Sequence, residues 1–134
     1  MEIRLLSLLK GARQAEGTTI IIDVYRAYTT AAVAFERGVE KIILVAEVDE
    51  ALDLRQQGLG QVCMGEVDGT RPPDFDFGNS PYEISRAQVH GKTLIQSTRA
   101  GTVGVAAAQK AGRIYAASLV VARATARAIR AQQP

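Results

Sequence analysis

Short runs of β-branched and aliphatic residues recur along this chain about every twenty residues, and this spacing limits the fold more than any other feature. The two clearest runs are residues 18–24, which include three consecutive isoleucines, and residues 41–45. Weaker runs lie at 61–64, 93–95 and 113–117. Continuous apolar runs of this length are typical of strands that are buried on both faces of a parallel sheet.

Stretches with helical character separate these runs. We predict helices over residues 30–37, 48–57, 102–111 and 119–131, and the first three are followed by glycines, which commonly end helices. This alternation predicts an α/β fold, with a parallel-dominated sheet of about five strands and helices on both faces. Residues 3–9 fit either a strand or a helix. No linker or repeat divides the 134 residues, so we expect one domain over residues 1–134.

Composition excludes several classes of protein. The apolar run at residues 5–9 is too short for a signal peptide or a membrane span, so we expect a cytoplasmic protein without a membrane partner. Cys63 lies in an apolar segment and is predicted to be a buried thiol. His90 is the only histidine and lies in a predicted turn, so a zinc site is not expected.

Charge is divided unevenly along the chain. All 14 acidic residues lie within residues 1–83, and the charged residues of 84–134 are all basic. The basic residues are dispersed and no aromatic residues are interleaved with them, so we expect no nucleic-acid partner. Two charge-complementary halves of one domain explain the asymmetry more simply.

Residues 65–81 are rich in glycine and proline and are predicted to form a long irregular loop, which is often functional in a compact domain. The loop ends in Ser80-Pro81-Tyr82-Glu83, the pattern of a capping box in which Ser80 caps a helix and Glu83 reaches back. The loop is therefore expected to present a helix N-terminus, where anions bind readily.

Polar residues follow the predicted strands, at the sheet edge where open parallel sheets bind ligands. Carboxylates there suit Mg²⁺, whereas arginine and hydroxyl groups suit a phosphate or sulfonate. The polar residues at this edge also have a purely structural alternative to ligand binding, because they could act as helix caps, form ion pairs or simply begin helices. The candidates after the first, third, fourth and fifth strands are Asp23, Arg26, Thr29 and Thr30; Glu66 and Asp68; residues 97–102; and Ser118.

Five ordered segments resemble one family. Residues 23–30, Asp-Val-Tyr-Arg-Ala-Tyr-Thr-Thr, are similar to the D-V-x-R-A-x-T-T segment of the 2-phosphosulfolactate phosphatase family. Residues 43–51 follow as that family's next segment, and the loop from Gly65-Glu66 to residues 75–81 resembles its most distinctive stretch. Residues 91–102 and 117–119 come next in the family's order.

The resemblance implies an α/β fold and Mg²⁺-dependent hydrolysis of the phosphate ester of a small sulfonated hydroxy acid, a step in coenzyme M synthesis. On this hypothesis Asp23, Arg26 and Glu66 are catalytic, and Asp23 and Glu66 bind the metal. We expect one cleft to be shared by Asp23, Arg26, Glu66, Asn79, Ser80 and Thr102. The residues predicted to bind the small anionic substrate are Thr29, Thr30, Asn79, Ser80, Ser97, Thr98, Gly101, Thr102 and Ser118.

The chain departs from the family pattern at three positions. Val67 stands where the family usually has arginine, and Ala100 and Val121 stand where it tends to have asparagine. Family members also continue into a further C-terminal portion. The alternative hypothesis is therefore a shortened, non-catalytic module that binds anions and serves oligomerisation. We also expect a homodimer, formed through the alanine-rich helices at 103–111 and 119–131.

Overall fold

A computed structural model describes residues 1–132 as six strands and six α-helices with one 3₁₀ turn. The elements are α1 (Leu8–Gln14), β1 (Gly17–Ile22), α2 (Ala27–Glu36), β2 (Lys41–Val45), α3 (Val48–Gln56), β3 (Val62–Gly65), β4 (Phe77–Gly78), α4 (Pro81–Ser85), β5 (Thr93–Ser97), α5 (Gly101–Ala107), β6 (Ala111–Ala117), the 3₁₀ turn η1 (Leu119–Val121) and α6 (Ala122–Ala131).

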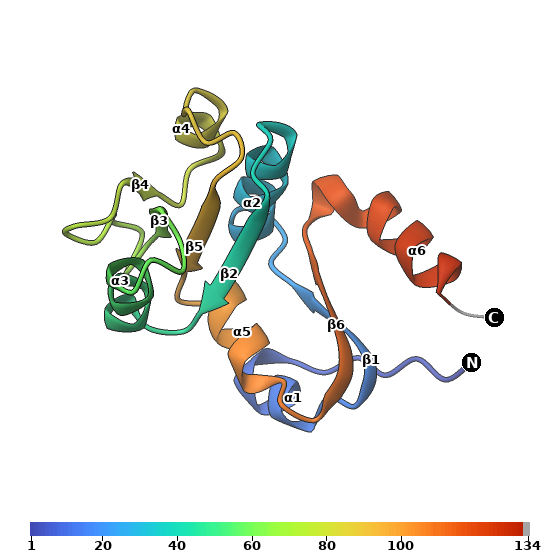
Figure 1. Ribbon diagram of the computed structural model, residues 1–134. Helices are drawn as coiled ribbons and strands as arrows, with labels where there is room; N and C mark the ends of the chain where they lie inside the picture. Colours follow the sequence, from blue (N-terminus) through green and yellow to red (C-terminus); the bar gives the residue numbers. More distant parts are fainter. Residues whose placement is uncertain (133–134) are drawn as a thin grey trace.

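The strands form two parallel sheets rather than the single sheet of about five strands expected from the sequence. The larger sheet has the order β2-β5-β3-β4, and the smaller one pairs β1 with β6 (Figure 1). Every pairing within these sheets is parallel, and helices flank the strands, so the predicted α/β class is confirmed.

The larger sheet is covered on both faces. Consecutive residues of β3 enter different apolar clusters: Met64 packs with Ala34 of α2 and Ile84 of α4, whereas Cys63 packs with Ala51 of α3. Neighbouring residues of a strand point to opposite faces, so α2 and α4 cover one face and α3 covers the other. Cys63 is fully buried, as predicted.

Helix α5 lies between the two sheets. It contacts β1 and β6 of the smaller sheet and β2 and β5 of the larger one (Figure 1). No strand pairing joins the two sheets, so the residues that follow them are brought together by other segments. This arrangement decides how the candidate site is built.

Several predicted helix boundaries were wrong. The helix expected over 102–111 ends at Ala107, residues 108–110 form a turn, and Ala111 belongs to β6 because it pairs with Gly17 of β1. The helix expected from residue 30 already begins at Ala27. Residues 3–9 were expected to form a strand or a helix, but only residues 8 and 9 are helical, since α1 begins at Leu8. The last predicted helix begins as the 3₁₀ turn η1.

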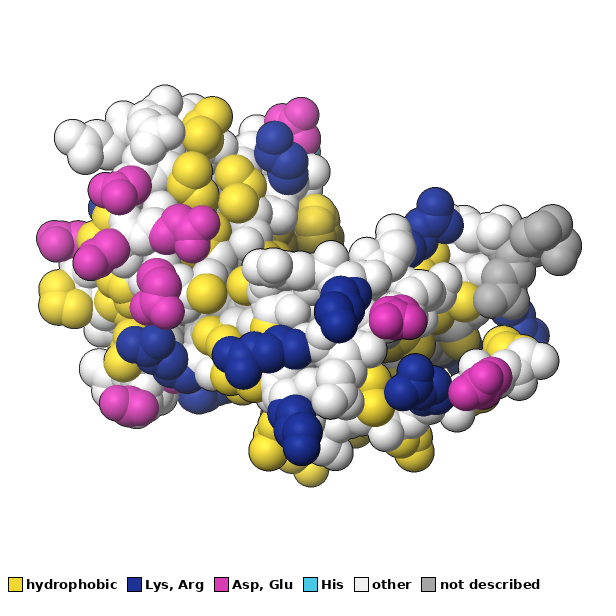
Figure 2. Space-filling model, turned by 90° about the horizontal axis from the view of Figure 1, so that it is seen from below, with side chains coloured by type: hydrophobic (Ala, Val, Ile, Leu, Met, Phe, Trp, Pro, Cys, Tyr) yellow, Lys and Arg dark blue, Asp and Glu magenta, His cyan; other side chains and the backbone are white. Residues whose placement is uncertain are grey.

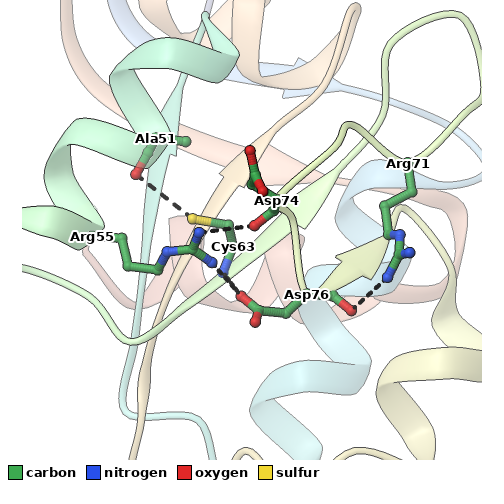
Figure 3. A network of polar contacts seen from close by, with 6 residues as sticks. All are labelled: Ala51, Arg55, Cys63, Arg71, Asp74 and Asp76. Atoms are coloured by element: carbon green, nitrogen blue, oxygen red, sulfur yellow. Dashed lines mark hydrogen bonds and ion pairs between the residues drawn. The ribbon is translucent and has the colours of Figure 1, made fainter.

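The long loop between β3 and α4 is mostly irregular, as predicted, but it contains the short strand β4. A polar network fastens it to the rest of the domain (Figure 3). Arg55 of α3 forms an ion pair of 2.8 Å with Asp76 and donates to the carbonyl oxygen of Asp74. The same Asp76 oxygen accepts from the backbone N–H of Cys63. The loop is thus held against α3 and β3.

The uneven charge of the sequence is visible on the surface. Figure 2 shows most of the acidic side chains of one face over the end of the molecule that holds α3, with lysine and arginine side chains toward the centre. Within residues 1–132, no helix has the length and apolar character that crossing a membrane requires.

Candidate functional site

Three predicted site residues lie next to one another beyond the larger sheet. The register pairs Gly65 of β3 with Gly78 of β4 on one side and with Ser97 of β5 on the other. The next residues of these three strands are Glu66, Asn79 and Thr98, and all three are buried. The parallel register therefore places a carboxylate, an amide and a hydroxyl at one sheet edge.

Glu66 is a buried carboxylate held by backbone groups. Its Oε1 accepts from the N–H of Arg99 at 2.8 Å, and its Oε2 accepts from the N–H of Gly69 at 2.8 Å. Only 9% of the residue is exposed, and among residues 1–132 it forms no ion pair. A buried carboxylate is normally paired with a cation or bound to a metal, so Glu66 is a candidate ligand for a cation.

Asp23 and Ser118 directly follow the two strands of the smaller sheet, as Glu66, Asn79 and Thr98 follow strands of the larger one. The last register pair of that sheet is Ile22 with Ala117, and the pairing continues when Asp23 N–H donates to the Ala117 carbonyl at 3.0 Å. Asp23 Oδ1 accepts from the backbone N–H of Arg26 at 3.2 Å, at the start of α2. Asp23 is partly exposed and Ser118 is buried.

One turn connects the two groups. Arg99, at the beginning of the turn, donates to Glu66, and Gly101, at its end, lies against Asp23: a β-carbon built on Gly101 would lie 3.3 Å from Asp23 Oδ2. Residues two positions apart have their Cα atoms no more than about 7 Å apart. The two predicted metal-binding carboxylates therefore flank the same short turn, although they follow strands of different sheets.

Tyr28 closes the contact between α2 and this turn. Its hydroxyl donates to the Gly101 carbonyl at 2.6 Å, and only 2% of the residue is exposed. Burial, and then the nearby Asp23 carboxylate, raise the pKa of the Tyr28 hydroxyl well above its ordinary value of 10. The hydroxyl therefore remains a donor throughout the neutral pH range.

The hydroxyls of several predicted substrate-binding residues are used inside the fold. Thr30 donates to the Arg26 carbonyl at 2.9 Å, as part of α2. Thr102 accepts from Thr98 N–H at 2.7 Å and donates to the Thr98 carbonyl at 2.9 Å. Ser97 donates to the Ala46 carbonyl at 3.4 Å. The bonds between Thr98 and Thr102 stabilise the turn after β5. Substrate binding by Thr30, Ser97, Thr98 and Thr102 stays a prediction.

Ser80 caps α4 as predicted, since its Oγ accepts from Glu83 N–H at 3.2 Å. The prediction that the Glu83 side chain reaches back to the backbone N–H of Ser80, as in a capping box, was wrong. Glu83 Oε2 accepts from Gly78 N–H at 3.0 Å, because the β4 backbone lies closer to its carboxylate than the cap does. Glu83 thus holds the end of β4, next to Asn79, in place.

Four buried side-chain oxygens have no hydrogen-bond partner in the described structure. Three belong to predicted site residues, namely Thr29 Oγ1 in the first turn of α2, Asn79 Oδ1 and Ser118 Oγ, and the fourth is Gln96 Oε1 in β5. Unsatisfied buried oxygens are rare, and an ion or a water molecule is one explanation for them. The carboxylates of Asp23 and Glu66 supply a donor set of oxygen atoms, which is the kind that Mg²⁺ accepts.

This donor set fits Mg²⁺ only with ligands beyond the protein. Within residues 1–132, no three side chains of histidine, cysteine, aspartate or glutamate come together as a metal-binding group. Mg²⁺ commonly uses one or two carboxylates and completes its shell with water and substrate phosphate. Neither of two surface hollows, of about 500 and 380 Å³, is lined by a residue of the predicted site.

Two residues at this site were not identified from the sequence. Tyr28 occupies a variable position of the D-V-x-R-A-x-T-T pattern, and only the structure shows its bond to Gly101. Gln96 is fully buried in β5 and donates to the Ala27 carbonyl at 2.8 Å. The available signal for Gln96 was a long polar side chain that directly follows the apolar pair Leu94 and Ile95 in a predicted strand.

The positions that depart from the family pattern lie around the same edge. Val67 is half-buried and exchanges backbone hydrogen bonds with Thr70 in the loop. Ala100 is the exposed N-cap of α5, next to Gly101. Val121 ends the 3₁₀ turn that follows Ser118.

Comparison with known proteins agrees with the resemblance in sequence. The family model described as 2-phosphosulpholactate phosphatase matches residues 5–134. A probable 2-phosphosulfolactate phosphatase of Thermus thermophilus is 41% identical over 112 residues, which are 83% of this chain and 46% of that protein. One of Carboxydothermus hydrogenoformans is 38% identical over 127 residues, covering 94% and 52%, respectively.

A third relative agrees with these two. A probable 2-phosphosulfolactate phosphatase of Thermoplasma acidophilum is 33% identical over 114 residues, which are 85% of this chain and 51% of that protein. The chain thus spans about half the length of the curated relatives it matches. Since the family model covers nearly every residue, the chain belongs to the 2-phosphosulpholactate phosphatase family.

Proposed function

We propose that this chain hydrolyses a small phosphate monoester with the help of Mg²⁺, and that the substrate is 2-phosphosulfolactate. The observation that carries the proposal is Glu66: a buried carboxylate without a cationic partner in the described structure, next to the unsatisfied Asn79 Oδ1. The names of the relatives support the reaction and substrate, and with them the place in coenzyme M synthesis that the resemblance implies.

The residues divide into those that hold the cation and those that hold the substrate. Glu66 and Asp23, which lie near the two ends of the 99–101 turn, would hold Mg²⁺. When bound, Mg²⁺ would neutralise charge on the phosphoryl oxygens. Arg26 is exposed at the start of α2, where its guanidinium can bind an oxyanion. Thr29 Oγ1, unsatisfied in the same helical turn, donates to that oxyanion.

The alternative from the sequence is a non-catalytic module that keeps the anion site. The names of the relatives do not favour this alternative. It makes a different prediction for the wild-type chain, namely phosphate binding without turnover of any ester. The same assay therefore separates the two functions.

The first prediction concerns Asp23. The wild-type chain should release phosphate from 2-phosphosulfolactate only when Mg²⁺ is present. Asp23→Asn should lower kcat/KM by about 100-fold, which corresponds to about 2.7 kcal/mol of transition-state stabilisation. The fold should persist because an asparagine oxygen can still accept from the Arg26 N–H. Phosphate release and thermal unfolding of each variant measure the two effects.

Asp74→Asn is the matched control. It removes a charge of the same kind from an exposed residue of the long loop, and Asp74 has a left-handed backbone (φ 66°) that asparagine tolerates. Its kcat/KM should stay within twofold of wild type. No turnover of any ester by the wild-type chain would refute the enzymatic proposal, and equal losses in the two variants would refute the role of Asp23.

We also propose that the chain assembles as a homodimer. Apolar side chains are exposed along β1 and in η1, including Ile22 (64%), Leu119 (67%) and Val120 (66%). No residue of α6 is buried, although this helix carries apolar residues beside its arginines. Exposed apolar surface of this kind commonly marks an interface.

A further inference from the structure

Two buried hydrogen bonds tie the start of α2 to the β5–α5 connection. Gln96 of β5 donates through Nε2 to the Ala27 carbonyl at 2.8 Å, and Tyr28 donates to the Gly101 carbonyl at 2.6 Å. All four residues are buried. Since α2 follows β1 of the smaller sheet and α5 follows β5 of the larger one, these bonds connect segments of different sheets.

The packing around Gly101 leaves no free space on the side of α2. A β-carbon built on Gly101 would lie 3.0 Å from Ala27 Cβ, 3.2 Å from Tyr28 Cζ and 3.3 Å from Asp23 Oδ2. The phenol ring and the Asp23 carboxylate thus border the same small space beside Gly101. Asp23 Oδ1 also accepts from the N–H of Arg26, two residues before Tyr28. A shift of the start of α2 relative to Gly101 would therefore change the distance from Asp23 to the turn.

We propose that Tyr28 is a positioning residue for the phosphatase reaction: its bond to Gly101 fixes Asp23 at a set distance from the turn whose other end is held by Glu66. The inference rests on the proposed function, because it assigns Asp23 and Glu66 to one metal site. Tyr28 itself reaches neither substrate nor metal, since its hydroxyl is buried and used by Gly101.

The position of Asp23 depends on few other contacts. Its side chain accepts one hydrogen bond, from Arg26 N–H at the exposed beginning of α2. Within residues 1–132 it forms no ion pair. Small displacements of reacting or metal-binding groups cost up to about 100-fold in rate. Loss of the Tyr28 hydroxyl should therefore affect the rate more than the fold.

The test is Tyr28→Phe, which keeps the ring and removes the hydroxyl. Phosphate release from 2-phosphosulfolactate should show a kcat lowered by about tenfold, a KM within twofold of wild type and a half-saturating Mg²⁺ concentration raised by at least threefold. The midpoint of thermal unfolding should fall by only about 3–5 °C, as expected for one lost hydrogen bond. Tyr82→Phe, at an exposed residue of α4, should change none of these quantities.

Gly101→Ala displaces the same groups by a different route, because the added methyl group presses on Tyr28 and Asp23. It should lower kcat by at least as much as Tyr28→Phe. Gly112→Ala is its control, since the nearest atom to a β-carbon there is 3.6 Å away, an ordinary contact. A Tyr28→Phe enzyme with wild-type kcat and Mg²⁺ dependence would overturn the proposal. A decrease in kcat that is fully explained by a smaller fraction of folded protein would overturn it as well.

Failure of the proposed function has a separate readout. If the wild-type chain releases no phosphate, titration calorimetry with Mg²⁺ alone decides the role of Tyr28. A threefold or larger loss of Mg²⁺ affinity in Tyr28→Phe, with Tyr82→Phe unchanged, would support positioning without catalysis. Equal affinities in the three proteins, or no Mg²⁺ binding by the wild-type chain, would overturn the Tyr28 proposal.

Discussion

At the scale of single residues, two carboxylates near the long loop differ in how their charge is satisfied. Asp76 pairs with the Arg55 guanidinium and accepts from the Cys63 backbone, whereas Glu66 is held by backbone N–H groups alone. A carboxylate with a cationic partner has a structural explanation. One without such a partner in the described structure is where a cation ligand is expected.

Asp76→Asn should destabilise the domain without affecting catalysis. It removes the ion pair with Arg55, which is 28% exposed, and weakens the attachment of the loop to α3. We expect the free energy of unfolding to fall by about 1 kcal/mol, since partly exposed pairs contribute little more. Urea denaturation measures it. Asp74→Asn is the control, because Asp74 contributes only its carbonyl oxygen to the network; similar losses in both variants would contradict this explanation.

Burial also affects the neighbouring thiol. It raises the pKa of Cys63, with the Arg55 charge lowering it and Asp76 raising it to smaller extents. A buried thiol with a raised pKa is a weak nucleophile at neutral pH. Cys63 therefore belongs to the core, in agreement with the prediction from sequence.

At the scale of elements, the strands were predictable because their apolar runs are bounded by polar or glycine residues. The sequence around Ile20, Ile43 and Ile95 was enough to locate β1, β2 and β5. The division into two sheets was not predictable. It arises because α5 packs between β1 and β2, and no local pattern encodes which parallel strands become neighbours.

The end of α5 shows the same limit. Alanine and glycine at residues 111–112 fit a helix terminus as well as a strand, and the pairing of Ala111 with Gly17 decides between them. Tertiary pairing overrode local propensity here. The carboxyl-end placement of Asp23, Glu66 and Ser118 was predictable, since it follows from strand direction alone.

Gly65→Ala should disrupt the end of β3. Gly65 has φ 153°, and a β-carbon there would lie 1.8 Å from the Ser97 carbonyl oxygen, which also accepts from Glu66 N–H. Relief of this clash requires β3 and β5 to separate, so we expect a loss of about 3 kcal/mol or more in the free energy of unfolding. Chemical denaturation measures the loss.

Gly112→Ala serves again as the comparison, because a methyl group is accommodated there without a close contact. Its free energy of unfolding should lie within about 1 kcal/mol of wild type. If Gly65→Ala were equally stable, the backbone contact between β3 and β5 would be looser than described.

At the scale of the whole molecule, the smaller sheet is the less covered part. The strand β1 buries Thr19 but leaves Ile20 and Ile22 exposed, although strands of parallel sheets are normally covered on both faces. In the larger sheet, by contrast, β3 is buried throughout. The sequence did not reveal this difference, because both strands are apolar runs of the same kind.

The proposed homodimer should depend on this surface. Sedimentation of the wild-type chain should show a dimer whose proportion rises with concentration, and the double substitution Ile22→Lys and Val120→Lys should shift it to monomer, because buried lysines oppose association. Leu59→Lys is the control, at a residue that is 52% exposed before β3 of the other sheet. A wild-type chain that stays monomeric at high concentration would contradict the proposal.

The pairing of β1 with β6 also has a consequence for how the chain folds. The strands of the larger sheet all lie between residues 41 and 97, so this sheet assembles from one continuous segment, whereas Gly17 finds Ala111 only across nearly the whole chain. Closing a long loop is entropically costly and slows the contacts that require it. During synthesis, β6 is also made long after β1. We therefore expect the neighbours Asp23 and Ser118 to meet in a late step of folding, so that the domain gains half of its candidate site after the core of the larger sheet has formed.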